Sequence, residues 1–337
     1  MDIPHEKLII QRNAALDVLR VLACAMVVLM HSPIPNIGTP GFVLSGLSYL
    51  TSPCIGLFFM ASGALLLPNG TEQAAHFNTK QFLCKRFSKI ALPTIIWTVF
   101  SVLLEMIGIK NAERDVLWFM YTLAGLYLLT PILSRWLYQA SKAEIELYQC
   151  LWFVTLLVPF IKLFISINES DTSCLYYFHG YIGYYVWGGY LNRFTFNKLQ
   201  KYIYILALVV FSICIPLAVL GLHIEIDFYS LFWYLSLPVV LMCTFWWFLC
   251  HHIQKTHKMV TILSKLSFGI YLVHILVMRN IIWKIDGIST ICGVGNALSG
   301  ILQIIITTIA SFGISTILCY LISKTSIGGI LIGTKKK

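Results

Sequence analysis

The stretch Leu16–His31, LDVLRVLACAMVVLMH, is apolar except at Asp17, Arg20 and His31. Its length and composition predict a helix that lies in lipid. Arg20 and His31 are eleven residues apart. At about 3.6 residues per turn, eleven steps end within about 20° of three full turns, so both side chains lie on one face, roughly 16 Å apart along the axis. Such side chains are costly in a membrane and are functional candidates there.

The composition of the whole chain agrees with a membrane location. Of its 337 residues, 58% are hydrophobic and only 11% are charged. A soluble domain does not need this much apolar surface, so the composition predicts an all-α polytopic membrane protein. No small-x-small cleavage site follows the first apolar stretch, and we interpret it as a retained first span rather than a signal peptide. We expect a single membrane-embedded domain over residues 1–337.

Hydropathy predicts about ten transmembrane helices of about 20 residues each. The loops between them alternate between many and few Lys and Arg residues. Because positive charge collects in cytoplasmic loops, we expect both termini to be cytoplasmic. The same rule accounts for the net charge of +10, so we expect the lipid bilayer and no nucleic acid as a partner. The approximate spans are residues 14–32, 51–68, 90–109, 116–134, 148–167, 176–192, 202–222, 228–250, 264–283 and 298–322.

The ten cysteines show no metal-binding pattern in the sequence. They form no CxxC pair, and most lie within apolar runs, which is typical of small core residues. Cys174 and Cys292 lie near predicted outer loops, where a pairing stays open. His251, His252 and His257 cluster in one loop without acidic partners. We expect no metal cofactor.

Two interpretations are open for Arg20 and His31. A histidine at a helix end is often interfacial, and an arginine in a span often extends its side chain to the headgroups. Their shared helix face favours a joint role instead. A histidine titrates near neutral pH and can take a proton from a hydroxyl that attacks a carbonyl, so His31 is a candidate general base.

The second predicted span, residues 51–68, is interrupted by Pro53 and several glycines. Such breaks free backbone groups, which are tolerated only where protein or a cavity satisfies them. Freed amides near Ser62 and Gly63 are therefore candidate donors to an oxyanion. The alternative is a packing face at Ala61–Ala64, where small residues let two helices approach closely, and the two roles can coexist.

The segment Lys80–Pro93, before the third predicted span, carries a dense basic cluster that includes Lys85, Arg86 and Lys89. We expect this segment to be a loop. Its cations can bind phosphate groups through charge-assisted hydrogen bonds. Ordinary topology charge and contact with anionic lipid are the alternatives, and composition alone favours them.

Three more residues are candidates for contact with a substrate. His274 lies in the apolar stretch Leu263–His274 and needs a hydrogen-bond partner there, so a structural bond and a direct role are equally open. Trp118 and Tyr121, at the outer end of the fourth predicted span, are candidates for stacking on sugar rings. An aromatic belt at the membrane interface is the favoured alternative for both.

Taken in order, these stretches resemble the acyltransferase 3 family of integral membrane acyltransferases. The resemblance covers most of the chain, and it includes short members that transfer acetyl or succinyl groups to surface polysaccharides. Ala64 stands where many members carry tyrosine, and Lys89 where arginine is common, which leaves the substrate class open. The fragments that carry the resemblance are Leu16-Asp17-x-x-Arg20 with His31, Leu57-Phe58-Phe59-Met60-Ala61-Ser62-Gly63, Lys85-Arg86-x-x-Lys89-Ile90-x-x-Pro93, Leu117-Trp118-Phe119 with Tyr127-Leu128-Leu129-x-Pro131, Tyr184-Tyr185-x-x-Gly188-Gly189-Tyr190, and Ser267-Phe268-Gly269-Ile270-Tyr271-Leu272-x-His274.

This resemblance implies acyl transfer from acetyl-CoA or succinyl-CoA to a hydroxyl of a cell-surface polysaccharide or its lipid-linked precursor. It also implies a location in the cytoplasmic, or inner, membrane. His31 matches the essential histidine of the family, and Arg20 matches its partner arginine. Lys85 and Arg86 match a basic motif that is associated with CoA.

One mechanistic hypothesis combines these inferences. Lys85, Arg86 and Lys89 hold the CoA phosphates on the cytoplasmic side. The pantetheine arm extends past Arg20, and His31 acts as general base on the acceptor hydroxyl. A covalent acyl-histidine intermediate stays open.

Two other function classes fit the same composition. A polysaccharide or lipid-linked sugar exporter (flippase) also needs many spans and buried charges, and a scaffold for glycan synthesis needs no catalytic residue. The face shared by Arg20 and His31, together with the basic cluster, favours the enzyme. Turnover of acyl-CoA distinguishes an enzyme from an exporter, and a silent His31→Ala substitution would identify a scaffold.

Overall fold

The computed structural model describes residues 13–34, 38–68, 78–107, 116–162, 165–166, 169–210, 233–285 and 296–334. These residues form helices and connecting turns, and no strand occurs among them. Of the short η elements, η1 is a π-helical turn, whereas η3 and η5 are 3-10 helices. The elements in chain order are α1 (Ala14–His31), α2 (Gly41–Thr51), α3 (Pro53–Leu66), α5 (Thr79–Arg86), η1 (Phe87–Ala91), α6 (Leu92–Met106), α7 (Trp118–Gln139), α8 (Lys142–Ile161), η3 (Glu169–Leu175), α9 (Ile182–Arg193), α10 (Lys198–Val209), α13 (Leu237–His251), α14 (Lys258–Asn280), η5 (Ile282–Lys284), α16 (Ala297–Lys324) and α17 (Gly328–Ile332).

The helices confirm the predicted all-α membrane architecture. Within the described residues, six helical segments are long and apolar enough to cross a membrane, and α13 is a shorter apolar helix. Each predicted span falls at least partly on a described helix, but residues 211–232 and both chain ends lie outside the described residues. The number of spans and the side of the termini therefore stay predictions. The six segments are Ala14–His31, Gly41–Leu66, Thr79–Met106, Lys142–Ile161, Lys258–Lys284 and Ala297–Lys324.

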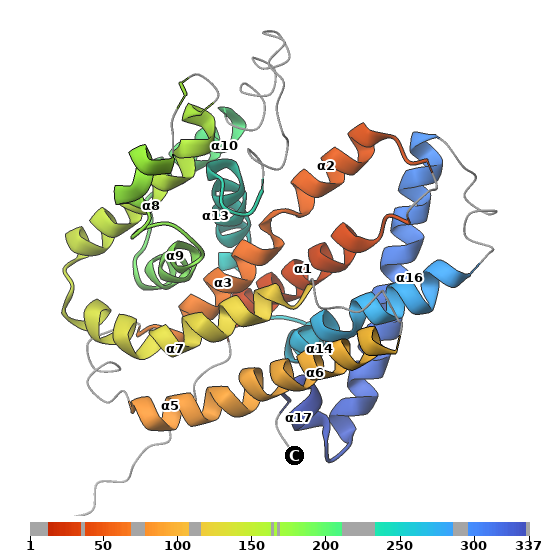
Figure 1. Cartoon of the computed structure of the whole chain (residues 1–337). Helices are drawn as coiled ribbons and strands as arrows, with labels where there is room; N and C mark the ends of the chain where they lie inside the picture. The colour runs from red at the N-terminus through yellow and green to blue at the C-terminus, as the bar shows by residue number, and fades with distance from the viewer. Residues whose placement is uncertain are drawn as a thin grey trace, which may run out of the picture.

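Helix α1 is an inner helix, and α3, α13, α14 and α16 all pack against it (Figure 1). Asn13 begins the helix, since its side chain accepts a hydrogen bond from the backbone N–H of Leu16 at 3.2 Å. Leu19, Ala23 and Val27 repeat every four residues and are almost fully buried. This apolar face docks into the core. The helix that carries the polar side chains is thus surrounded by protein more than by lipid.

Helices α3 and α9 pack at close range because a glycine of each helix meets the backbone of the other. A Cβ atom added at Gly63 would overlap the carbonyl oxygen of Tyr185. One added at Gly188 would overlap the carbonyl oxygen of Met60. The predicted packing role of the small residues in α3 is therefore confirmed.

The predicted backbone break near Ser62 and Gly63 is wrong. Helix α3 runs without interruption over Pro53–Leu66, so the amides of both residues are committed to hydrogen bonds within the helix. These amides therefore cannot serve as oxyanion donors. The break lies earlier, at Ser52 between α2 and α3. Proline at the first position of α3 explains it, because the proline ring favours the start of a helix and disfavours its interior.

The basic segment before the third predicted span is helical, which corrects the expectation of a loop. The side chain of Asn78 accepts a hydrogen bond from the N–H of Gln81 at 3.0 Å and begins α5. The helix continues through the π-helical turn Phe87–Ala91 into α6. Such turns are frequent at functional sites. The helical backbone holds the basic side chains in fixed relative positions, which a loop would not.

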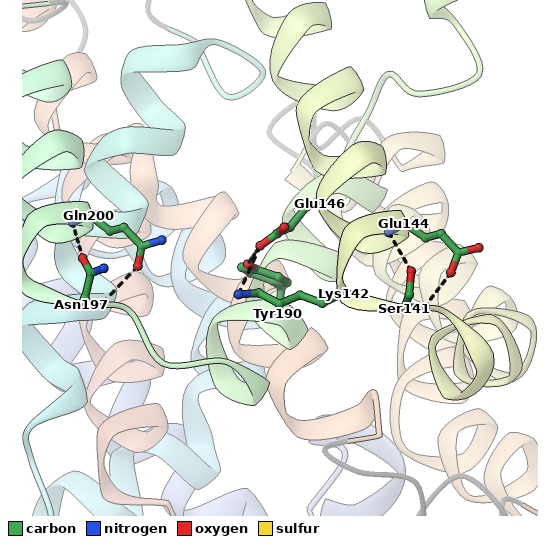
Figure 2. A network of polar contacts seen from close by, with 7 residues as sticks. All are labelled: Ser141, Lys142, Glu144, Glu146, Tyr190, Asn197 and Gln200. Carbon is green, nitrogen blue, oxygen red and sulfur yellow. Dashed lines mark hydrogen bonds and ion pairs between the residues drawn. The ribbon is translucent and has the colours of Figure 1, made fainter.

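Polar contacts cap the starts of α8 and α10 and join α9 to α8 (Figure 2). Reciprocal capping boxes begin α8 and α10. Between them, Tyr190 on α9 donates a hydrogen bond to Glu146 on α8 at 2.5 Å, and Lys142 lies 3.5 Å from the same carboxylate. These contacts hold α9 against α8 and so support its packing on α3. The two capping boxes are Ser141 with Glu144 and Asn197 with Gln200.

Candidate active site

The structure brings together two of the sequence-predicted residues, His31 and His274. Their ring centroids are 5.3 Å apart, and the rings meet edge to face at an angle of 64°. His31 ends α1, His274 lies on α14, and the two helices pack against each other. His31 is half-buried, whereas His274 is completely buried.

Backbone carbonyl groups determine which nitrogen of each imidazole carries the proton. Nδ1 of His31 lies 2.8 Å from the carbonyl oxygen of Val27, and Nδ1 of His274 lies 2.6 Å from that of Tyr271. A carbonyl oxygen only accepts hydrogen bonds, so in each neutral ring Nδ1 is the protonated nitrogen. Each Nε2 is then left with a lone pair that can accept a proton or a hydrogen bond. Nε2 of His274 has no hydrogen-bond partner among the described residues.

Two polar contacts hold α1 and α14 in register on the N-terminal side of the histidine pair. Ser264 donates a hydrogen bond to the buried carboxylate of Asp17 at 2.7 Å, and the thiol of Cys24 lies 3.6 Å from the carbonyl oxygen of Ser267. The contacts follow in the same order along both helices. Sequence reasoning missed this role of Asp17, although a carboxylate in an otherwise apolar helix was a usable signal.

Arg20 does not join the histidine pair. Helix α1 is unbroken from Ala14 to His31, so Arg20 stays about 16 Å from His31 along the axis. Arg20 is half-buried. The structure keeps the two side chains at different depths on one helix, as their spacing predicts, and does not place both at one reacting centre.

A second set of polar contacts anchors the end of α1 on α16. The hydroxyl of Ser32 shares a hydrogen bond with that of Thr308 at 2.6 Å, and Gln303 donates to the carbonyl oxygen of Ser32 at 3.0 Å. The residue after His31 is therefore held by α16. Sequence reasoning missed this anchor, whose signal is a run of buried polar residues every fourth position along α16. These residues are Ser299, Gln303, Thr307, Ser311 and Ser315.

Trp118 belongs to an aromatic cluster that reaches α1. Its ring centroid lies 5.4 Å from that of Tyr181 and 5.6 Å from that of Tyr234. The hydroxyl of Tyr234 contacts the sulfur of Met30 at 3.2 Å, and Met30 directly precedes His31. Trp118 and Tyr181 are half-buried. The cluster therefore connects the start of α7 with the end of α1.

Tyr121, the other predicted stacking residue, lies outside this cluster. Its side chain is 46% exposed, and its hydroxyl shares a hydrogen bond with that of Thr98 on α6 at 2.8 Å. This position agrees with the alternative interpretation of an interfacial aromatic residue.

The three residues of the basic cluster have different environments. Lys85 is exposed, and Lys89 is half-buried in the π-helical turn. The guanidinium of Arg86 lies over the rings of Phe82 and Tyr127, at 5.4 Å and 5.5 Å from their centroids. Its Nε is buried and has no hydrogen-bond partner among the described residues. A guanidinium held in this way can donate to an anionic ligand.

The segment after α16 folds back onto the basic helix. Trp97 on α6 donates its indole N–H to the carbonyl oxygen of Leu331 at 2.8 Å. Gly333, at a φ of 64°, lies so close to the carbonyl oxygen of Lys89 that a Cβ atom would overlap it. Helix α17 also packs on α14 and α16, below α6 in Figure 1. It therefore connects the basic segment with α14.

Comparison with known proteins assigns nearly the whole chain to one domain type. A family model described as an acyltransferase domain matches residues 13–322. The match runs from the start of α1 almost to the end of α16. No curated protein and no solved structure matches the chain.

Proposed function

The chain belongs to the acyltransferase 3 family, and from this premise we propose that it transfers an acetyl group from acetyl-CoA to a hydroxyl of a cell-surface polysaccharide or its lipid-linked precursor. Family membership and the apolar helices establish a multi-pass membrane acyltransferase. O-acylation, the polysaccharide acceptor and the inner membrane are proposals that rest on the sequence resemblance. The geometry of His31 is the observation that supports acyl transfer to a hydroxyl.

His31 supplies the general base in this proposal. Its Nδ1 is bonded to the carbonyl oxygen of Val27, which leaves Nε2 as the acceptor at the half-buried end of α1. Nε2 takes the proton of the acceptor hydroxyl while the hydroxyl oxygen forms a bond to the thioester carbon. The carbon–sulfur bond then breaks. The leaving CoA thiolate takes a proton from the imidazolium, and neutral His31 is restored.

The basic cluster supplies the donor site. Lys85, Arg86 and Lys89 hold the phosphates of CoA through charge-assisted hydrogen bonds. The Nε of Arg86, which has no partner in the described part of the chain, supports this role. The pantetheine arm extends past Arg20 toward His31. The rise of about 16 Å between these two residues is comparable to the length of that arm. Succinyl-CoA is the alternative donor, with the same chemistry at its thioester.

Transfer of label from radioactive acetyl-CoA tests the proposal. The full-length protein is purified in lipid and given glycan from the source organism. We expect labelled glycan with the wild type and a loss of about 100-fold or more with His31→Ala, because a general base typically contributes that much. His252→Ala is the matched control, since His252 is exposed, and its rate should be unchanged.

Three outcomes would contradict the proposal. No label from acetyl-CoA or succinyl-CoA argues against the enzyme. If deletion of the gene for this protein also alters the distribution of the glycan across the membrane, the chain is an exporter. Transfer that continues in a folded His31→Ala protein, judged by gel filtration, removes His31 as the base.

A further inference from the structure

The buried ring of His274 presents a hydrogen-bond acceptor to which no described residue donates. Its side chain is completely buried, and its Nδ1 is bonded to the carbonyl oxygen of Tyr271. Its Nε2 has no hydrogen-bond partner among the described residues. Buried polar atoms are almost always hydrogen-bonded, because the loss of hydration without a new partner is costly. The orphaned nitrogen points to a ligand that brings a donor.

His31 presents a second acceptor beside the first. The two ring centroids are 5.3 Å apart, and both Nδ1 atoms are bonded to backbone carbonyls of their own helices. Two imidazoles with this tautomer cannot hydrogen-bond to each other through Nε2, since each Nε2 carries a lone pair and no proton. The pair therefore offers two acceptor nitrogens on neighbouring rings.

A single hydroxyl cannot serve both nitrogens, because it carries one proton. Two hydroxyls on neighbouring carbons can. We propose that the acyl acceptor presents a vicinal diol to the pair. One hydroxyl gives its proton to His31 as its oxygen attacks the thioester, and its neighbour donates a hydrogen bond to His274. This inference rests on the proposed function and adds the arrangement of hydroxyls at the acylated position.

Buried aromatic rings pack beside the pair. The centroid of Tyr271 lies 5.7 Å from that of His274, and the centroid of Phe119 lies 5.2 Å from that of Tyr271. Both rings are buried in the core, so their packing fixes the position of His274. The acceptor reaches His274 from the side of His31, which is the half-buried member of the pair.

Two small acceptors that differ by one hydroxyl test the inference. Full-length protein in lipid transfers label from acetyl-CoA to trans-1,2-cyclohexanediol or to cyclohexanol. We expect kcat/KM for the diol to exceed that for cyclohexanol by about tenfold or more, because the single alcohol leaves the acceptor of His274 unpaired.

Variants at His274 separate an effect on specificity from a loss of structure. His274→Phe keeps an aromatic ring without an acceptor. The ratio of kcat/KM for the diol to that for cyclohexanol should then fall to the value expected because the diol has two hydroxyls that can react and cyclohexanol has one. His274→Gln places an amide oxygen near the position of Nε2, without basicity, and should restore most of the preference. A purely structural role would lower both rates together and leave their ratio unchanged. If His274→Phe does not fold, His274→Leu replaces it.

The outcomes distinguish this inference from the proposed function. An unchanged ratio in a monodisperse His274→Phe protein overturns the diol, and a water molecule with two protons then accounts for both nitrogens. Transfer to neither alcohol, while glycan is still labelled in a His31-dependent way, overturns the diol but leaves the proposed function intact. Absence of His31-dependent transfer to every acceptor removes both.

Discussion

At the scale of single residues, local helix geometry determines the chemistry of each imidazole. Val27 lies four residues before His31, and Tyr271 lies three residues before His274, so each Nδ1 is bonded within its own helical turn. The tautomer is therefore a local property. The meeting of the two rings is not local, because it depends on the register of α1 against α14.

Removal of one hydroxyl tests that register. Ser264→Ala deletes the donor to the buried carboxylate of Asp17. We expect a loss of about 1–2 kcal/mol in the free energy of unfolding, since a hydrogen bond to a charge is worth more than the average bond between membrane helices. Thermal unfolding in detergent measures it. Ser323→Ala is the control, because Ser323 bonds within its own exposed turn. Equal Tm values would show that the contact does not hold the helices.

Arg86→Lys keeps the positive charge at the donor site but removes the planar guanidinium group. The planar guanidinium over Phe82 and Tyr127 is replaced by a compact ammonium group. We expect KM for acetyl-CoA to rise about threefold to tenfold, with a smaller change in kcat. Lys80→Ala, at an exposed position of α5, should leave KM unchanged. A wild-type KM for Arg86→Lys would mean that Arg86 does not contact the donor.

At the scale of elements, α17 braces the basic helix against α14, the helix that carries His274. It packs on α6, α14 and α16, and its C-terminal end meets the π-helical turn of the basic segment. π-helical turns are rare and are frequent at functional sites. We therefore expect changes in α17 to act on donor binding more than on the chemical step.

Two substitutions test this brace. Trp97→Phe removes the indole donor to Leu331 and keeps the aromatic ring. Gly333→Ala forces a Cβ toward the carbonyl oxygen of Lys89 at a φ of 64°, which favours glycine. Each should raise KM for acetyl-CoA about threefold to tenfold with kcat less affected. Gly313→Ala is the control, because no atom of the described residues lies within 4 Å of an added Cβ there. If KM is unchanged in both variants, α17 does not support the donor site.

At the scale of the whole molecule, the alternation of basic loops orients the protein in the membrane. It predicts that Cys84, beside the basic cluster, faces the cytoplasm and that Cys174, between α8 and α9, faces outward. Both thiols are free and exposed.

Labelling of intact cells tests this orientation. A membrane-impermeant maleimide should react with Cys174 and not with Cys84, and Cys84→Ser and Cys174→Ser variants assign the label. Permeabilised cells should show both reactions. Reaction of Cys84 in intact cells would reverse the assignment of sides.

Much of the fold follows from local patterns, and the errors have local causes. The apolar content predicts helices in lipid, and the spacing of Arg20 and His31 matches an unbroken α1. The basic segment is helical instead of a loop, because the cap at Asn78 starts a helix in a polar stretch. The break expected near Ser62 lies at Ser52, because proline interrupts a helix more strongly than glycine does.

Composition and periodicity predict the membrane class, the helix α1 and the candidate residues along it, because both act within one element. Which candidates meet depends on how the helices pack. The tertiary structure joins His31 with His274 and Asp17 with Ser264, and it keeps Tyr121 apart. The physical reason is that lipid tails are as apolar as the side chains they surround. Hydrophobicity therefore places each helix in the membrane, while close packing and a few polar contacts choose its neighbours.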